Sequence, residues 1–201
     1  MRQRQRGRDN DRSAGNRYTG IQVYNEKDGT GYTGNGDVKI RYYDTNGNSQ
    51  EYVGSAGTIT NGKLTLNLPE TVKEQYLEPI GKSVPDGTTA SPKDAKVLYV
   101  YRFYVPDASG YGPSLSYSKD DESSEDIIYY VYSSTAATIT GSVTEADEDK
   151  ETTYTETYNL NLKKGWNAVY EHWDWDANTE NGDITTDGSA VPSGLKWILS
   201  S

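Results

Sequence analysis

One segment near the C-terminus concentrates residue types that could bind a ligand. Residues 172–183 read H-W-D-W-D-A-N-T-E-N-G-D and include the chain's single histidine, His172. Strand alternation would place Trp173 and Trp175 on one face and His172 on the other. Sugar rings pack their apolar sides on indole rings, so His172, Trp173 and Trp175 form a candidate glycan-binding set. Burial of the two indoles in a hydrophobic core is the alternative.

The same segment matches part of a calcium-binding loop. Its candidate metal ligands are Asp174, Asp176, Asn178 and Glu180. Oxygen donors at alternating positions can converge on one hard cation, and the first three occupy positions 1, 3 and 5 of such a loop. The match then ends, because Thr179 replaces the turn glycine and Thr185 replaces the bidentate glutamate. Calcium is thus the one cofactor that the sequence suggests, and a solvated turn is the alternative.

The composition excludes several kinds of catalytic site. The chain has no cysteine and one histidine, which excludes thiol catalysis, cysteine-bound zinc and multi-histidine zinc sites, and a serine triad would need His172. The clustered carboxylates are Asp120, Asp121, Glu122, Glu125 and Asp126. They occupy a serine-rich stretch, whereas a general acid needs an apolar pocket that raises its pKa. We therefore predict no catalytic residues and no enzyme activity.

The hydrophobic pattern predicts that β-strands position these residues. Residues 63–68 alternate leucine with polar residues directly after Asn61-Gly62, a strong hairpin signal. Residues 96–105 and 125–132 carry apolar side chains at both odd and even positions, which is typical of central strands. In 96–105 the alternation would place Tyr101 on the same face as Val97, Tyr99 and Phe103.

The predicted fold is an all-β, antiparallel β-sandwich of about nine or ten strands. At most one short helical turn is expected, at residues 71–77. Tyrosine supplies 18 residues and must build much of the interior, together with Trp166 and Trp197. Residues 1–17 are predicted to be a flexible basic arm or leader, and residues 18–201 a single sandwich domain.

Charge is divided unevenly between these two parts. The first 17 residues contain six arginines and two aspartates, a formal charge of +4, so the remainder carries −14 of the net −10. An acidic body repels nucleic acid and anionic membranes, which leaves the arm as the only polyanion-binding candidate. The sequence contains no apolar run long enough for a signal peptide or a membrane helix.

Three pieces of sequence together resemble one kind of protein. Residues 57–69 read G-T-I-T-N-G-K-L-T-L-N-L-P, and residues 162–170, L-K-K-G-W-N-A-V-Y, are followed by L-K-W-I at 195–198. With the strand pair at 127–141, they resemble β-domains of secreted surface lipoproteins from host-associated bacteria of the spirochaete, fibrobacter and Bacteroidetes types. The resemblance implies an exported domain, at the cell surface, in the periplasm or outside the cell, whose function is largely unassigned. No lipid-acceptor cysteine is present, so a membrane contact would need an anchor outside this sequence.

The sequence therefore favours a non-catalytic exported module that acts in adhesion or in ligand binding, with a glycan or a surface protein as partner. A structural or assembly subunit that pairs through edge strands is the first alternative. An acidic-site hydrolase ranks below both, because it needs a deep cleft with two carboxylates and the sequence suggests none.

Overall fold

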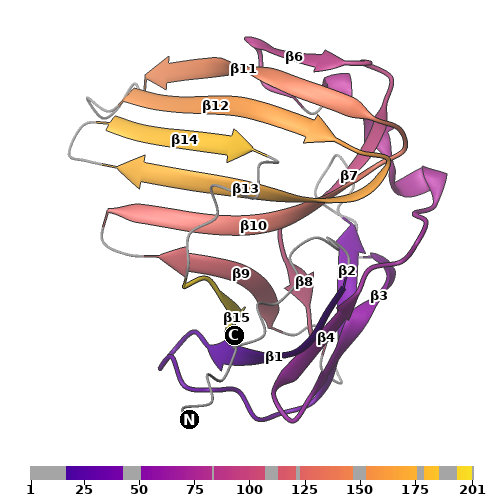
Figure 1. Ribbon diagram of the computed structural model, residues 1–201, viewed down its shortest axis with the longest axis vertical. Coiled ribbons are helices and arrows are strands. Elements are labelled where there is room, and N and C mark those ends of the chain that lie inside the picture. The colour runs from indigo at the N-terminus through magenta and orange to yellow at the C-terminus, as the bar shows by residue number, and fades with distance from the viewer. Residues whose placement is uncertain are drawn as a thin grey trace, which may run out of the picture.

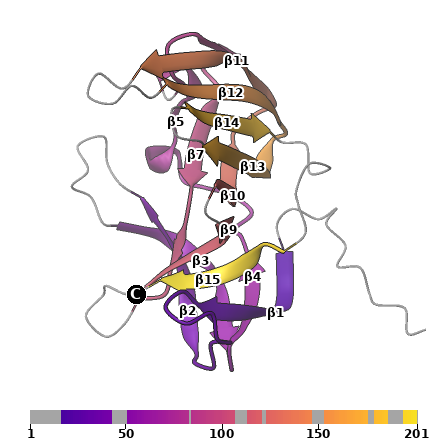
Figure 2. The ribbon, with the colours of Figure 1, turned by 90° about the vertical axis from the view of Figure 1, so that its left-hand side faces the viewer.

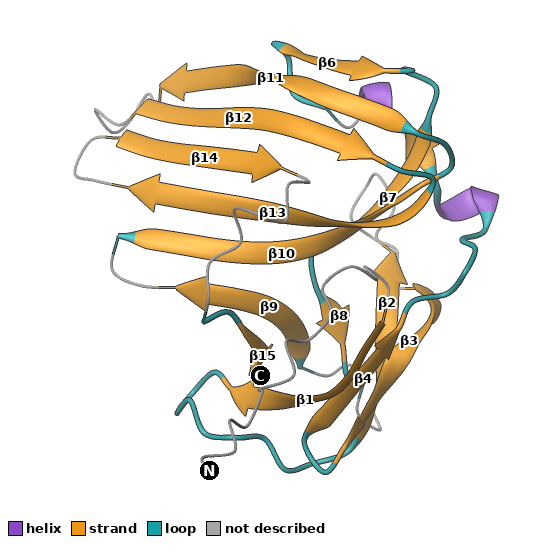
Figure 3. Ribbon diagram, viewed as in Figure 1, coloured by secondary structure: helices purple, strands orange, loops and turns teal. Residues whose placement is uncertain are grey.

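The computed structural model describes residues 17–42, 51–82, 84–106, 113–120, 123–146, 153–175, 179–185 and 194–200 (Figure 1). The strands are β1 Arg17–Asn25, β2 Gly36–Tyr42, β3 Glu51–Thr60, β4 Lys63–Asn67, β5 Glu78–Pro79, β6 Thr88–Ser91, β7 Lys96–Val100, β8 Phe103–Tyr104, β9 Ser114–Asp120, β10 Ser124–Ser133, β11 Ala137–Ala146, β12 Thr153–Leu162, β13 Gly165–Trp175, β14 Thr179–Thr185 and β15 Lys196–Ser200. Two 3₁₀ turns, η1 Glu74–Tyr76 and η2 Ile80–Lys82, complete the elements (Figure 3). The prediction of an all-β chain is confirmed.

Seven of the strands close into a barrel. Their order is β15-β1-β4-β3-β2-β8-β9, and β9 also pairs with β15, so the ring has no free edge. The remaining large strands extend from β9 in the order β10-β13-β14-β12-β11-β6, which we call the outer sheet. Figure 2 shows the barrel strands below and the outer sheet above.

This arrangement corrects the expectation of a two-sheet antiparallel sandwich of nine or ten strands. The physical reason lies in β9. On one side it pairs with β15 through residues 114–118, and on the other side it pairs first with β8 and then, through residues 117–120, with β10. Strand β9 of the barrel thus also carries the outer sheet, through its pairing with β10. Two of the pairings, β1 with β15 and β12 with β14, are parallel.

The hydrophobic core falls into two clusters. The larger fills the barrel and the space under β10 and β13, where Trp197 stacks on Tyr117 at 5.0 Å between ring centroids and meets Phe103 at 6.0 Å. Trp166 and Trp197 are buried, as predicted. The smaller cluster lies where η2 and β7 meet the outer sheet and includes Val97, Val131 and Ile139.

The helical content differs slightly from the expectation. The turn η1 falls within residues 71–77, where one turn was predicted, and η2 is an additional turn a few residues later. Among the described residues, no helix is long and apolar enough to cross a membrane.

Candidate functional site

Strand β13 carries most of the predicted site and sends it to two different faces. Its register with β10 places Trp173 opposite Glu125 and His172 opposite Asp126. Side chains directly opposite each other point to the same side of a sheet. Trp173 and Trp175 therefore lie on one face, which we call the cavity face, while His172 and Asp174 lie on the other, which we call the barrel face.

Trp173 is packed into the cavity face. Its indole stacks on Tyr154 of β12 at 5.0 Å, and its Nε1 donates a 2.5 Å hydrogen bond to Glu171 Oε1. Gly182 lies opposite Trp173 on β14, and a Cβ there would come within 2.6 Å of the indole ring. Trp173 is thus half-buried and held from three sides, as is typical of a packing residue. Trp175 is also half-buried.

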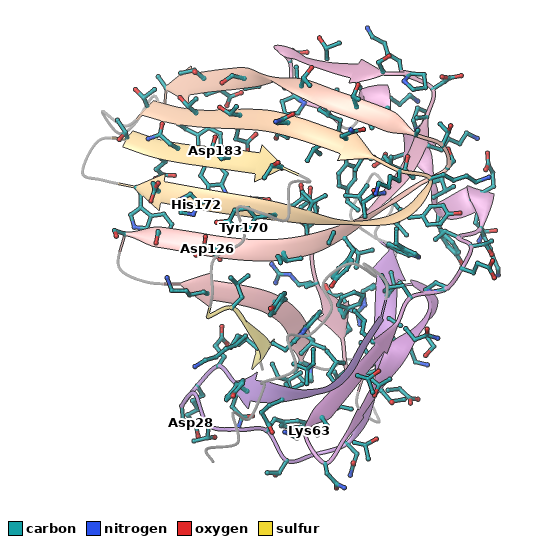
Figure 4. All side chains as sticks on the ribbon, viewed as in Figure 1. Asp28, Lys63, Asp126, Tyr170, His172 and Asp183 are labelled. Atoms are coloured by element: carbon teal, nitrogen blue, oxygen red, sulfur yellow. The ribbon has the colours of Figure 1, made fainter. Side chains whose placement is uncertain are left out.

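On the barrel face, His172 lies between two carboxylates. Its Nδ1 is 2.8 Å from Asp126 Oδ1, beside which it lies in Figure 4. Its Nε2 is 2.9 Å from Asp174 Oδ2. Tyr170 donates a 2.6 Å hydrogen bond to Asp126 Oδ1, and Lys119 Nζ lies 3.9 Å from Asp126 Oδ2. Burial lowers the pKa of His172, but the hydrogen bonds to Asp126 and Asp174 raise it further, so the net shift is upward. This network favours the imidazolium and holds the buried Asp126 carboxylate in place.

The structure describes two of the four predicted calcium ligands, Asp174 and Glu180, and it does not bring these two together. Asp174 lies opposite Asn181, whereas Glu180 lies opposite Trp175, so Asp174 and Glu180 are on opposite faces of the sheet. Asp174 is also hydrogen-bonded to His172. Asp176 and Asn178 lie outside the described residues, so the calcium interpretation stays a prediction. Within the part of the chain that is described, no three His, Cys, Asp or Glu side chains are placed to hold a metal.

A cavity of about 740 Å³ opens on the cavity face, where the outer sheet joins the barrel. One row of its lining crosses four strands: Glu171 lies opposite Ile127, Ile127 opposite Ser118, and Ser118 opposite Lys196. The remaining polar lining from these strands consists of Ser114, Ser116, Lys119, Glu125 and Ser200. We call this the larger cavity; hydroxyl groups and charges of both signs line it.

Tyr101 projects into the larger cavity as an exposed aromatic ring. The strand pattern is interrupted between β7 and β8 at residues 101–102, where the chain passes from β10, the partner of β7, to the barrel. Tyr101 is 55% exposed, the one exposed large hydrophobic residue among those described, and its ring lies 6.0 Å from Tyr99 and 4.7 Å from Tyr129. A single strand over 96–105 was predicted, with Tyr101 on the same face as Phe103. That prediction is wrong, because Phe103 enters the barrel core.

A second cavity of about 110 Å³ adjoins the first and shares Tyr101 and Glu171 with it. Its lining combines four tyrosines, two glutamates and four aliphatic residues: Tyr99, Tyr101, Tyr129, Tyr158, Glu156, Glu171, Val84, Ile139, Leu160 and Ile184. We call it the tyrosine cage. The hydroxyls of Tyr154 and Tyr158 donate hydrogen bonds to the two carboxylate oxygens of Glu156.

Electrostatics inside the cage favour neutral side chains. Burial, together with the charges of Glu156 and Glu125, raises the pKa of Glu171 against the opposing effect of the Trp173 hydrogen bond. Burial raises the pKa of Tyr129 far above its usual value, and partial loss of solvent with the nearby Glu171 and Glu156 raises that of Tyr101 to about 12. The tyrosines are therefore neutral at pH 7.

The carboxylates singled out in the sequence are separated by the sheet. Glu125 lines the larger cavity, Asp126 lies on the barrel face, and Asp121 and Glu122 are outside the described residues; Asp120 is the last residue of β9. The sequence suggested no cleft containing two carboxylates. The structure corrects this, because Glu125 and Glu171 both line the larger cavity.

The two cavities and their side chains supply the chemistry from which a function can be inferred. No protein-family model matches this chain, and neither a curated protein nor a solved structure matches it.

Proposed function

We propose that this chain is a non-catalytic binding module that holds a glycan in the larger cavity. The observation that carries the proposal is the exposed ring of Tyr101 beside a wall of serine hydroxyls. A cavity of about 740 Å³ falls within the usual range for ligand sites, roughly 300–1,000 Å³. The glycan site thus lies on the same face as Trp173 and Trp175, but is built on other residues.

The lining provides both kinds of contact that a sugar ring needs. The apolar face of a sugar packs on an aromatic ring, for which Tyr101 is available, and Tyr24 also lines the cavity. Sugar hydroxyls need donors and acceptors, and the serines of β9 offer both. Ser116 and Ser118 lie side by side, with their Oγ atoms 3.5 Å apart, so neighbouring hydroxyls can bind along the strand.

Replacing Tyr101 by alanine is expected to weaken glycan binding at least about tenfold, or roughly 1.4 kcal/mol, because the stacking surface is lost. A glycan array identifies the ligand, and calorimetry with wild type and Tyr101→Ala measures the loss. Tyr104→Ala is the matched control, since Tyr104 lies under Arg41 in the barrel wall and lines neither cavity. Equal losses in the two variants, or no glycan bound by the wild type, would contradict the proposal.

The placement of the carboxylates favours binding over hydrolysis. Glycosidases use two carboxyl groups that flank the scissile bond from opposite sides. Glu125 and Glu171 instead project from diagonal positions of neighbouring strands, on one surface of one sheet. The third glutamate of the lining, Glu26, follows β1 on the barrel side and is exposed, whereas a general acid needs an apolar pocket. Incubation of the wild type with its bound glycan should release no shortened product, as mass spectrometry can check.

Assembly through a sheet edge is a second candidate function, and one observation favours it. Strand β6 pairs only with residues 138–141 of β11, so residues 142–146 extend past β6 with no second neighbouring strand in the described part of the chain. Such an edge can accept a strand from a partner. If it does, light scattering should detect dimers at high protein concentration, and Val143→Pro should reduce them. A strictly monomeric wild type would contradict assembly of this kind between copies.

Export to the cell surface, the periplasm or the medium belongs to the same proposal. It is supported by the resemblance of residues 57–69 and 162–170 to surface lipoprotein β-domains. A surface glycan or protein is then the natural partner, and the acidic body disfavours nucleic acid.

A further inference from the structure

We propose that the tyrosine cage binds an ammonium group, so that the ligand of this protein is an amine-bearing glycan. The inference rests on the proposed function for the body of the ligand, which would lie in the larger cavity. It adds the charged group that the ligand must carry and the cavity that recognises it.

The ring geometry of the cage suits a cation. Tyr99 and Tyr101 stack with their planes 10° apart, and Tyr129 lies against Tyr101 at 36°. With Tyr158 these rings line one small cavity. Aromatic faces carry negative charge density, and sets of such rings are the usual binding sites for alkylated ammonium groups.

Two carboxylates strengthen the negative potential of the cage. Glu156 is held by tyrosine hydroxyls and Glu171 by the Trp173 indole, and among the described residues neither carboxylate has a basic partner. Three cations line the larger cavity: Lys196 Nζ lies 5.0 Å from the centre of the Tyr24 ring, Lys119 faces Asp126, and Arg102 follows Tyr101 and forms no described ion pair with Glu156 or Glu171. The cage thus holds two carboxylates that form no ion pair with a cation in the described part of the chain.

A bound ammonium would relieve the repulsion within the cage. Burial and the charges of Glu156 and Glu125 raise the pKa of Glu171, so the empty cage disfavours its ionised form. A cation beside Glu171 reverses that effect, and ligand binding should therefore release protons at a pH near the pKa of Glu171.

Size and connection define the ligand further. A volume of about 110 Å³ equals roughly three or four water molecules, which suits an ammonium group with a few methyl groups or one amine-bearing ring edge. Because both cavities share Tyr101 and Glu171, one ligand can place its cation in the cage and its sugar rings in the larger cavity. The matching glycan class is one with free amines, such as an oligomer of glucosamine.

The cage alone can be tested with choline chloride as the probe. Titration at pH 7.5 should shift the indole N–H signal of Trp173, which is assigned by its loss in Trp173→Phe. The neutral alcohol in which carbon replaces the choline nitrogen has the same shape without the charge, and sodium chloride controls for ionic strength. We expect choline to bind at least about tenfold more tightly than the neutral alcohol. Equal binding of the two probes would overturn the inference.

Variants then assign the cation to the cage. Glu171→Gln and Tyr158→Leu should each weaken choline binding at least about fivefold, whereas Tyr101→Phe should keep most of it. Glu180→Gln is the matched control, because Glu180 lies on the same face and lines neither cavity. An equal effect of Glu180→Gln would show that choline responds only to net charge, and would overturn the inference.

The two proposals can fail separately. A glucosamine tetramer should bind at least about tenfold more tightly than its N-acetylated counterpart, which has the same sugar backbone but no cation. If both bind equally and lose affinity in Tyr101→Ala, the glycan site stands and the ammonium inference fails. If choline binds in the cage but no glycan binds, the cage stands and the glycan function fails.

Discussion

Replacing Gly57 by alanine is expected to lower the free energy of unfolding by about 3 to 5 kcal/mol, since backbone strain and a steric clash add together. Gly57 has a φ of +154°, a conformation that side chains with a Cβ rarely adopt. A Cβ at this position would lie 2.0 Å from the Thr65 carbonyl oxygen and 3.0 Å from Leu66 Cα. Both atoms belong to the backbone of β4, so the barrel itself would have to shift.

Gly57 is needed there because β3 bends at this residue to follow the barrel wall. Val38 of β2 pairs with Gly57 and Lys39 pairs with Ser55, which leaves Ala56 as one extra residue on β3. A bulge of this kind bends a strand and brings its backbone close to a neighbour. Ala56 is fully buried at the bend, so the bulge also contributes a side chain to the core.

Urea unfolding measures the effect, and Gly54→Ala is the matched control. Gly54 lies in the same strand, and a Cβ there would have no atom within 4 Å. We expect Gly54→Ala to change stability by less than about 1 kcal/mol. A similar loss of stability in both variants would contradict the prediction, because it would show that the φ of Gly57 and its contact with β4 do not set the cost of the substitution.

The same hairpin shows which parts of a fold the local sequence predicts well. Asn61-Gly62 was predicted to join two strands, and it does, with φ angles of 49° and 72° in the turn between β3 and β4. The alternating leucines of β4 were predicted to share a face, and Leu64 and Leu66 are fully buried. Turn chemistry and two-residue alternation act over a few residues, so one sequence is enough to read them.

Barrel closure depends on contacts that no local pattern records. β1 and β15 are parallel neighbours from opposite ends of the sequence. The alternation of apolar and polar residues in each strand does not indicate which strand is its neighbour. The interruption between β7 and β8 has a similar origin, because residues 97–105 form an unbroken apolar run apart from Arg102. The pairing partners of that run change at residues 101–102, from β5 and β10 to β2 and β9. Only the tertiary arrangement reveals that change.

The tyrosine cage has a weak signature in the sequence, which differs from that of a cluster of catalytic residues. Glu171 is two residues from Val169 and from Trp173, and Glu156 is two residues from Tyr154 and from Tyr158. Residues two apart in a strand share a face, so each glutamate lies on the apolar face of its strand. A carboxylate on such a face costs free energy unless it has a partner or a ligand. That rule could have marked both residues, but their meeting with Tyr101 follows from the order of strands β12, β14 and β13.

Replacing Asp126 by alanine is expected to lower the free energy of unfolding by about 2 to 4 kcal/mol. Asp126 is 4% exposed and accepts a hydrogen bond from Tyr170, and His172 Nδ1 lies 2.8 Å away. Alanine at position 126 removes the carboxylate that both groups contact. The hydroxyl of the buried Tyr170 then has no acceptor there, and the His172 imidazolium loses its buried counter-charge. Urea unfolding of wild type and variant at pH 6 measures the loss.

Asp174→Ala is the matched control for the same histidine. The Asp174 carboxylate lies 2.9 Å from the other ring nitrogen, but its side chain is exposed, so water can replace it. We expect a loss below about 1 kcal/mol, the usual range for an exposed ion pair. Equal losses from Asp126→Ala and Asp174→Ala would show that burial of Asp126 does not set the strength of the network.

The pH dependence of stability follows from the direction of the His172 shift. The hydrogen bonds to Asp126 and Asp174 outweigh burial and raise the pKa of His172 above its unfolded value of about 6.5. A raised pKa means that the folded state binds the proton more tightly, so the stabilisation is complete below pH about 6.5 and is lost as the pH rises through the folded pKa. The chain has one histidine, so a single imidazole NMR signal reports this titration directly. In Asp126→Ala the titration should move to lower pH and the decline in stability above pH about 6.5 should flatten; an unchanged His172 titration would show that Asp126 does not hold the proton.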